Sequence, residues 1–151
     1  GEYTEDVKNA IKNSGVEKLE YILCTHGHFD HVTGAVKIKK EYPDAKICIG
    51  KEDSLYLEDG LLSLASMFNV DFEPCKPDME FSHGDTLSIG NINVQIHSAP
   101  GHTPGGVLYV LEDEIDVAAL LFQLFFSFFF IFIGYCNFFT YLYIISLPWP
   151  W

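Results

Sequence analysis

Hydrophobic and polar positions follow one pattern in the first half of the chain and another in the second. Residues 20–25 and 46–49 are apolar runs with almost no polar alternation, which is typical of strands buried on both faces. Each run is preceded by a segment with apolar positions on one helical face, at 5–13 and 32–42. The order helix, strand, helix, strand predicts parallel pairing and an α/β fold.

The pattern changes near residue 78. Residues 51–58 and 61–68 favour one or two further helices, broken near Gly60, and residues 69–78 favour a loop that contains two prolines. Beyond this loop the pattern predicts antiparallel strands, because apolar and polar residues now alternate and a Gly-Asn step marks a hairpin turn. The predicted strands are 85–89, 92–98 and 106–111.

Three histidines and one aspartate lie within six residues, directly after the first apolar run. In an extended segment His26, His28 and Asp30 point to one side, and a helix that follows would turn His31 toward the same cavity. Imidazole nitrogens and carboxylate oxygens are ligands of zinc, and of iron or manganese at related sites. The spacing predicts a metal site, with the imidazole pair for one cation and Asp30 with His31 for a second. The alternative is a polar surface loop that binds nothing.

A second motif, Pro100-Gly101-His102-Thr103-Pro104-Gly105, lies far downstream. Together with His-x-His-x-Asp-His after a hydrophobic strand, it resembles the metallo-β-lactamase superfamily over residues 1–114. The form of the second motif is most similar to the glyoxalase II-like hydrolases. The resemblance implies an α/β fold, the four-layer αββα metallo-β-lactamase sandwich. It also implies that His102 completes the ligand set of the first metal with His26 and His28.

The activity that the resemblance implies is metal-dependent hydrolysis of a thioester or ester, such as a hydroxyacyl-glutathione, by metal-bound hydroxide. The cofactor would be one or two Zn²⁺ ions, with iron or manganese as alternatives. Asp30 is the predicted catalytic residue, because it would bind the second metal and help to orient the nucleophile. His83 and His97 are expected to lie outside the ligand set, and no substrate-binding residue is predicted.

The sequence also departs from the superfamily pattern. The superfamily has a bridging aspartate in a Gly-Asp step and a final histidine, but no histidine follows His102 and no Gly-Asp follows the strand at 106–111. The opening hairpins of the fold are missing too. The resemblance therefore implies an incomplete domain over residues 1–116. Two alternatives to an active hydrolase stay open: a non-catalytic remnant that binds metal weakly, and an enzyme similar to a mono-iron persulfide dioxygenase.

Residues 117–151 differ from the rest of the chain. They carry no charge and hold nine of the thirteen phenylalanines. Three hypotheses compete: a non-native tail from a frame error or read-through, a transmembrane segment over about 117–147, and a buried continuation of the sheet. The codons of these residues would be rich in thymine, which favours the first hypothesis.

Charge and cysteine content narrow the expected partners. The net charge of −12 disfavours nucleic acid, so a small ester or thioester is the expected partner, and a membrane only if the tail is genuine. The four cysteines have no paired spacing, and Cys24 is interpreted as a buried strand residue rather than an extra ligand. The chain opens on polar residues without a signal peptide, so a reducing, cytoplasmic location is expected. The oligomeric state is not predicted.

Overall fold

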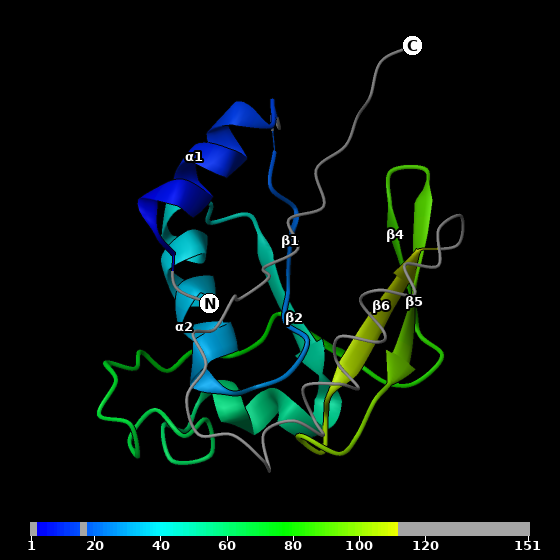
Figure 1. Ribbon diagram of the computed structural model, residues 1–151. Coiled ribbons are helices and arrows are strands. Elements are labelled where there is room, and N and C mark those ends of the chain that lie inside the picture. Colours follow the sequence, from blue (N-terminus) through cyan, green and yellow to red (C-terminus); the bar gives the residue numbers. More distant parts are fainter. Residues whose placement is uncertain (1–2, 16–17, 112–151) are drawn as a thin grey trace, which may run out of the picture.

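The computed structural model describes residues 3–15 and 18–111, and the hypotheses about residues 117–151 lie outside this part of the chain (Figure 1). Two helices come first, interleaved with parallel strands, and an antiparallel sheet follows. The elements are α1 (Glu5–Asn13), β1 (Tyr21–Leu23), α2 (Phe29–Glu41), β2 (Lys46–Gly50), the 3₁₀ helix η1 (Lys51–Leu57), β3 (Met79–Phe81), β4 (Thr86–Ile89), β5 (Ile92–Ser98) and β6 (Val107–Leu111). Within the described residues, no helix is long and apolar enough to cross a membrane.

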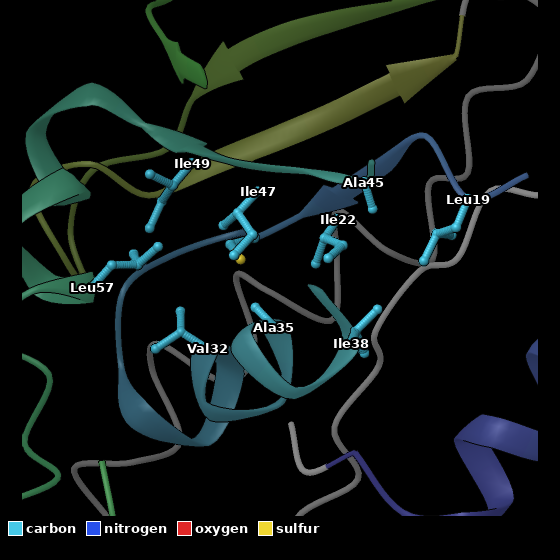
Figure 2. Packing of buried hydrophobic residues seen from close by; sticks show 10 residues of the cluster. Leu19, Ile22, Val32, Ala35, Ile38, Ala45, Ile47, Ile49 and Leu57 are labelled. Atoms are coloured by element: carbon cyan, nitrogen blue, oxygen red, sulfur yellow. The ribbon is translucent and has the colours of Figure 1, made fainter. Parts of the chain in front are cut away.

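The first sheet has the order β1-β2-β3 and all its pairs are parallel, which confirms the predicted pairing of the first two strands. Side chains alternate across this sheet, and both faces are buried. One face packs on α2, where apolar side chains of the helix and of β1 and β2 meet (Figure 2). The labelled residues of this core include Ile22, Ile47 and Ile49 from the strand side and Val32, Ala35 and Ile38 from α2.

The second sheet is antiparallel, with the order β4-β5-β6, and it covers the other face of the first sheet (Figure 1). Apolar side chains of both sheets form one core between them: Leu23, Cys48, Phe81, Leu87, Val94, Ile96 and Val107. The hydroxyl of Tyr109 donates a hydrogen bond of 2.9 Å to the carbonyl oxygen of Cys24 and so joins β6 to the end of β1. Helices, first sheet and second sheet are three successive layers of the predicted αββα sandwich.

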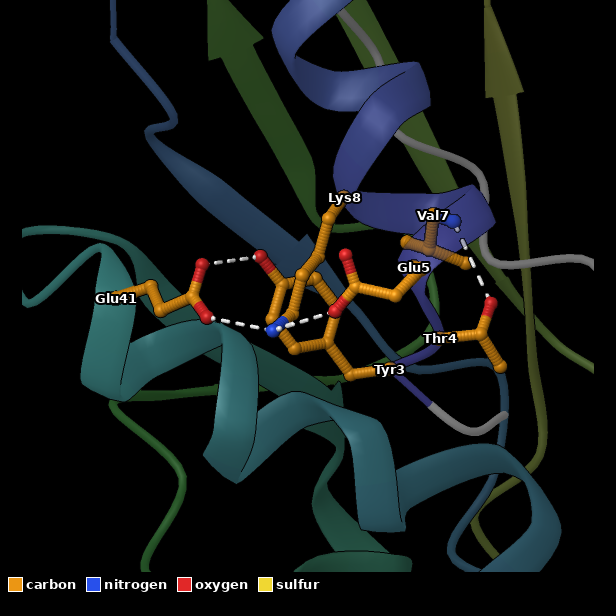
Figure 3. A network of polar contacts seen from close by, with 6 residues as sticks. All are labelled: Tyr3, Thr4, Glu5, Val7, Lys8 and Glu41. Carbon is orange, nitrogen blue, oxygen red and sulfur yellow. Dashed lines mark hydrogen bonds and ion pairs between the residues drawn. The ribbon is translucent and has the colours of Figure 1, made fainter.

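Helix α1 is confirmed at its predicted bounds, because its ends carry strong local signals. The hydroxyl of Thr4 accepts a hydrogen bond from the backbone N–H of Val7, and Gly15 follows the helix with a positive φ of 71°. A polar network then attaches the helix to the end of α2 (Figure 3). In this network the carboxylate of Glu41 accepts a hydrogen bond of 2.7 Å from the Tyr3 hydroxyl and pairs with Lys8 at 3.1 Å.

Three sequence predictions need correction. Residues 51–57 form a 3₁₀ helix instead of an α-helix. Residues 60–69 form turns, because Leu64 and Asn69 take positive φ values of 68° and 53° that no α-helix admits. Strand β3 was not predicted, and it pairs in parallel with β2 although the pattern after residue 78 indicated only antiparallel strands. Helix α2 begins at Phe29 rather than at residue 32, and this shift changes the geometry of the candidate site.

Candidate metal centre

Two loops far apart in the sequence bring three histidines together. His26 and His28 lie in the connection from β1 to α2, and His102 lies in the connection from β5 to β6. The backbone N–H of Val107 donates to the carbonyl oxygen of Thr25 at 2.8 Å, so the two connections are joined directly beside the histidines. Each of the three imidazoles offers one nitrogen within 4.8 Å of the others. We call His26, His28 and His102 the long-range group.

A second set of donors is formed locally. His26, Asp30 and His31 each offer one ligand atom within 4.8 Å of the others, and we call these residues the local group. The sequence placed Asp30 in an extended segment beside the histidines, and this was wrong. Asp30 and His31 both lie in the first turn of α2, with Asp30 Oδ2 at 3.4 Å from His31 Nε2. The helix, rather than strand alternation, therefore turns both side chains toward His26.

His26 belongs to both groups and is the most buried of the histidines, with 6% of its surface exposed. Its Nδ1 lies 3.2 Å from the hydroxyl oxygen of Thr25, whereas its Nε2 is buried without a hydrogen-bond partner in the structure. A buried ring nitrogen without a partner is costly, and a cation beside it would remove that cost. The contact with Thr25 suits a proton on Nδ1, which leaves the lone pair on Nε2 for a metal.

The spacing of the other donors also fits a cation. His28 Nδ1 and His102 Nε2 face each other at 2.9 Å. Tetrahedral zinc with bonds of about 2.0–2.1 Å holds its ligand atoms roughly 3.3 Å apart, so a small outward shift would admit the ion. Nitrogen donors in one group, with a carboxylate in the other, match the ligand preferences of zinc and of iron or manganese. The residues present therefore fit a metal.

Burial holds these histidines in the form that binds metals. Burial is the largest cause of the shift of the His26 pKa to about 2, and the neighbouring histidines lower it further. Burial likewise lowers the pKa of His31 to about 4, although the charge of Asp30 opposes this. The pKa of His28 is also lowered, by burial first and then by His102. At neutral pH these imidazoles are uncharged, so their lone pairs are available to a cation.

One residue of the site was missed in the sequence. Asp53 lies in η1, three residues after β2, and its side chain is fully buried. Its carboxylate accepts hydrogen bonds from the backbone N–H of Gly27 at 2.9 Å and of Gly105 at 2.7 Å. Gly27 separates His26 from His28, and Gly105 follows His102 by three residues. A carboxylate just beyond the carboxyl end of a buried parallel strand was a usable signal, but residues 51–58 were predicted only as a helix and Asp53 was not singled out.

The remaining candidates lie outside both groups. His83 and His97 contact each other on the second sheet with ring centroids 5.5 Å apart, and His83 Nδ1 accepts a hydrogen bond from the backbone N–H of Ser98. Cys24 is buried, and burial raises the pKa of its thiol to about 12, which suits a core residue rather than a metal ligand. Among the described residues, neither candidate metal group contains these three side chains.

An apolar segment lies beside the site. The backbone N–H of Phe29, at the start of α2, donates a hydrogen bond of 2.9 Å to the carbonyl oxygen of Ser63. The ring centroids of Phe29 and Phe68 lie 5.3 Å apart. The ring of Tyr56 lies 6.1 Å from His28. Several large side chains of this segment are exposed: Leu55, Leu61, Leu62, Met67 and Phe68. Aromatic rings of this segment therefore lie near His28 and against Phe29, the next residue in the chain.

A layered α/β fold with histidine-rich loops at one sheet edge defines a class of metal-site proteins, and comparison with known proteins identifies the family. A sequence profile described as "Metallo-beta-lactamase superfamily" matches residues 3–118. The chain belongs to the metallo-beta-lactamase superfamily, as its two motifs indicated, and this superfamily typically binds metal ions. The predicted α/β metallo-β-lactamase fold is confirmed.

Individual relatives differ in their named activities. The chain is 33% identical over 102 residues to "Hydroxyacylglutathione hydrolase GloC" of Haemophilus influenzae, covering 66% of this chain and 47% of that protein. It is 28% identical over 104 residues to the mitochondrial persulfide dioxygenase ETHE1 of Mus musculus, covering 69% and 33%. The crystal structure of the B3 metallo-beta-lactamase BLEG-1 superposes with a TM-score of 0.64 at 26% identity, covering 72% of this chain and 52% of that one. The chain thus spans about half or less of the length of these relatives.

Proposed function

We propose that the protein is a metal-dependent hydrolase that cleaves a thioester or ester of the hydroxyacyl-glutathione kind. The observation that carries the proposal is the buried Nε2 of His26, which has no hydrogen-bond partner, on a residue that belongs to both groups of donors. The similarity to a hydroxyacylglutathione hydrolase supports the choice of substrate class. The apolar segment beside the histidines supports an organic substrate rather than a bare ion.

Different residues of the chain would bind the cations and orient the reacting groups. His26, His28 and His102 would hold one cation, and Asp30 and His31, with His26 nearby, would hold a second. A bound cation of this kind polarises a carbonyl oxygen and lowers the pKa of water to roughly 7. Thr25 would hold the His26 ring through Nδ1, so that Nε2 keeps its direction. The carboxylate of Asp30 would accept a hydrogen bond from the attacking group and so orient it toward the substrate.

We also propose a compartment, a partner and a metal. We place the reaction in the cytoplasm, and the free thiols of Cys24, Cys48 and Cys75 support a reducing compartment. The proposed partner is a small thioester or ester, with no role for nucleic acid. Zinc is the proposed metal, with iron or manganese as the alternatives that the same donors accept.

The test combines metal content with thioester hydrolysis. The full chain is purified, its bound metals are measured by mass spectrometry, and the loss of the thioester absorbance of S-lactoylglutathione is followed with zinc, manganese or iron(II) added. Hydrolysis that His26→Ala abolishes and His97→Ala preserves supports the proposal. His97 is a matched control, since it is a histidine of the same chain outside both groups.

Two other results would overturn the proposal and point to a different function. A protein that retains no metal and hydrolyses nothing is a non-catalytic member of the superfamily. A protein that retains iron and consumes oxygen in the presence of glutathione persulfide, without cleaving the thioester, is a dioxygenase. The similarity to a persulfide dioxygenase is the observation that favours this second activity.

A further inference from the structure

The His26–His28 loop and the His102 loop both donate a hydrogen bond to one side chain, that of Asp53. Asp53 contributes one oxygen to each loop: Oδ2 accepts from the N–H of Gly27, and Oδ1 accepts from the N–H of Gly105. The two N–H groups belong to residues that are 78 positions apart in the sequence, so a single carboxylate bridges the whole span between the motifs. The side chain has no exposed surface, and water therefore cannot replace either bond at low cost.

The His26–His28 loop and the His102 loop also approach residues 50–56, which include Asp53, very closely. A Cβ atom on Gly105 would collide with the backbone nitrogen of Asp53, and one on Gly27 would collide with the side chain of Tyr56 in the same 3₁₀ helix. A Cβ atom on Gly50, at the end of β2, would collide with the carbonyl oxygen of Gly105. The backbones approach this closely only because three glycines stand at the contacts. The position of each loop is therefore set by direct contact with residues 50–56.

We infer that Asp53 is a positioning residue that fixes the distance between the His26–His28 loop and the His102 loop, and so assembles the long-range group. The inference rests on the proposed metal centre. Asp53 does not itself join either group of donors. It acts through the backbone of Gly27, which lies between two of the histidines, and through that of Gly105, which lies in the loop of the third.

The chemistry of the side chain explains why an aspartate stands here. A carboxylate has two oxygens that accept hydrogen bonds and none that must donate. Two N–H groups approach it from opposite loops, so both oxygens are used as acceptors. An asparagine of the same size would keep one acceptor and turn its amide NH₂ group toward an N–H donor. Asp53→Asn therefore changes one hydrogen bond without creating a cavity.

The decisive comparison is between Asp53→Asn and Asp78→Asn. Asp78 is the control: its carboxylate also accepts a backbone N–H, that of Ile47 at 2.8 Å, but it is partly exposed, pairs with Lys39 and lies near the opposite end of β2. Cobalt(II) or zinc affinity is measured by competition with a chromophoric chelator on folded protein. We expect Asp53→Asn to weaken the affinity by about 10- to 100-fold, the usual effect of losing a partner that orients metal ligands. Asp78→Asn should leave it unchanged.

A double-variant cycle separates positioning from general destabilisation. If Asp53 acts through the long-range group, its replacement should weaken metal binding far less in a His102→Ala background than in the unaltered protein. Equal losses in both backgrounds would overturn the inference, as would an Asp53→Asn protein with unaltered affinity. Absence of metal binding by the unaltered protein would instead refute the proposed function.

A measurement on the unaltered, metal-free protein keeps the inference testable if Asp53→Asn fails to fold. The amide protons of Gly27 and Gly105 share one buried acceptor side chain, so both should exchange slowly with solvent deuterium and at similar rates. Amide NMR resolves the two signals. Fast exchange at either glycine, at the rate of an amide in an unstructured peptide, would show that the carboxylate does not hold that loop.

Discussion

The long-range group and the local group offer similar donors but are built in different ways. The local group lies within six residues, at the end of one strand and in the first turn of the helix that follows. The long-range group needs His102, whose loop is brought to the site by the packing of the second sheet on the first. The local group depends on the conformation of one connection, whereas the long-range group depends on the tertiary fold.

This difference explains the position of Asp53. A short segment can place its own side chains through backbone geometry alone, and α2 does this for Asp30 and His31. Two separate loops need a common partner that fixes them against each other, and the carboxylate of Asp53 is that partner. Changes at the contact between the loops should therefore disturb one group more than the other, and this can be measured.

The largest expected effect comes from removing one ligand of each group. His102→Ala should abolish binding by the long-range group and leave the local group able to hold a cation weakly, and His31→Ala should do the reverse. Zinc binding free energies of about 10–16 kcal/mol over four ligands give roughly 3 kcal/mol per ligand, or about 100-fold in affinity. Isothermal titration with zinc gives both affinity and stoichiometry. Identical titrations for the two variants would show that the groups are not separate.

The next effect comes from the close approach of the two loops. Gly105→Ala places a Cβ atom against the backbone of Asp53, so we expect the free energy of unfolding to fall by about 2 kcal/mol and zinc affinity to fall with it. Gly90→Ala is the control, because it meets no atom within 4 Å and strains only a turn with φ of 59°. It should lower stability by about 1 kcal/mol without changing zinc affinity. Urea denaturation and chelator competition measure the two quantities.

The same difference decides what the sequence could predict. The bounds of α1 were correct because Thr4 and Gly15 carry its capping chemistry in the sequence. The start of α2 was missed because its N-cap is His28, whose side chain makes no capping hydrogen bond, so no local signal marks that end. Strand β3 has three residues, too few for a period to show, and only its pairing with β2 defines it.

The candidate site divides in the same way. The donors of the local group are neighbours in the chain, so their spacing alone indicated a metal site. His102 could be joined to them only through the resemblance to the superfamily, because nothing in the sequence states that two loops 74 residues apart will meet. Asp53 offered only its place just beyond a buried strand as a signal, because its hydrogen bonds to Gly27 and Gly105 exist only in the folded protein.

A smaller effect is expected at Asp78, which tests whether any carboxylate that accepts a backbone N–H near β2 influences the site. Burial alone would raise the pKa of Asp78, but the hydrogen bonds from Lys39 Nζ and Ile47 N outweigh it and hold that pKa below its usual value. A lowered pKa in the folded state stabilises the protein above about pH 4 and ceases to do so as the pH falls through the lowered value.

Asp78→Asn should therefore lower the free energy of unfolding by about 1 kcal/mol at pH 7, and the difference should shrink toward zero as the pH falls through the lowered pKa of Asp78. Urea denaturation across this pH range measures it. Zinc affinity at pH 7 should equal that of the unaltered protein. A pH-independent difference would mean that the carboxylate acts through its shape rather than its charge.

The smallest effect is expected farthest from both groups, at the attachment of α1 to α2. Tyr3→Phe removes the hydroxyl that donates to Glu41 and leaves the ring and the contact of Lys8 with Glu41 in place (Figure 3). Because the bond is exposed to solvent, water replaces it, and we expect the midpoint of thermal unfolding to fall by less than about 2 °C. Zinc affinity should not change, because α1 contributes no donor and the lost bond ends at Glu41, the last residue of α2. A loss of affinity in Tyr3→Phe would show that the position of α2 against α1 is transmitted to Asp30 and His31, and that the local group depends on tertiary packing after all.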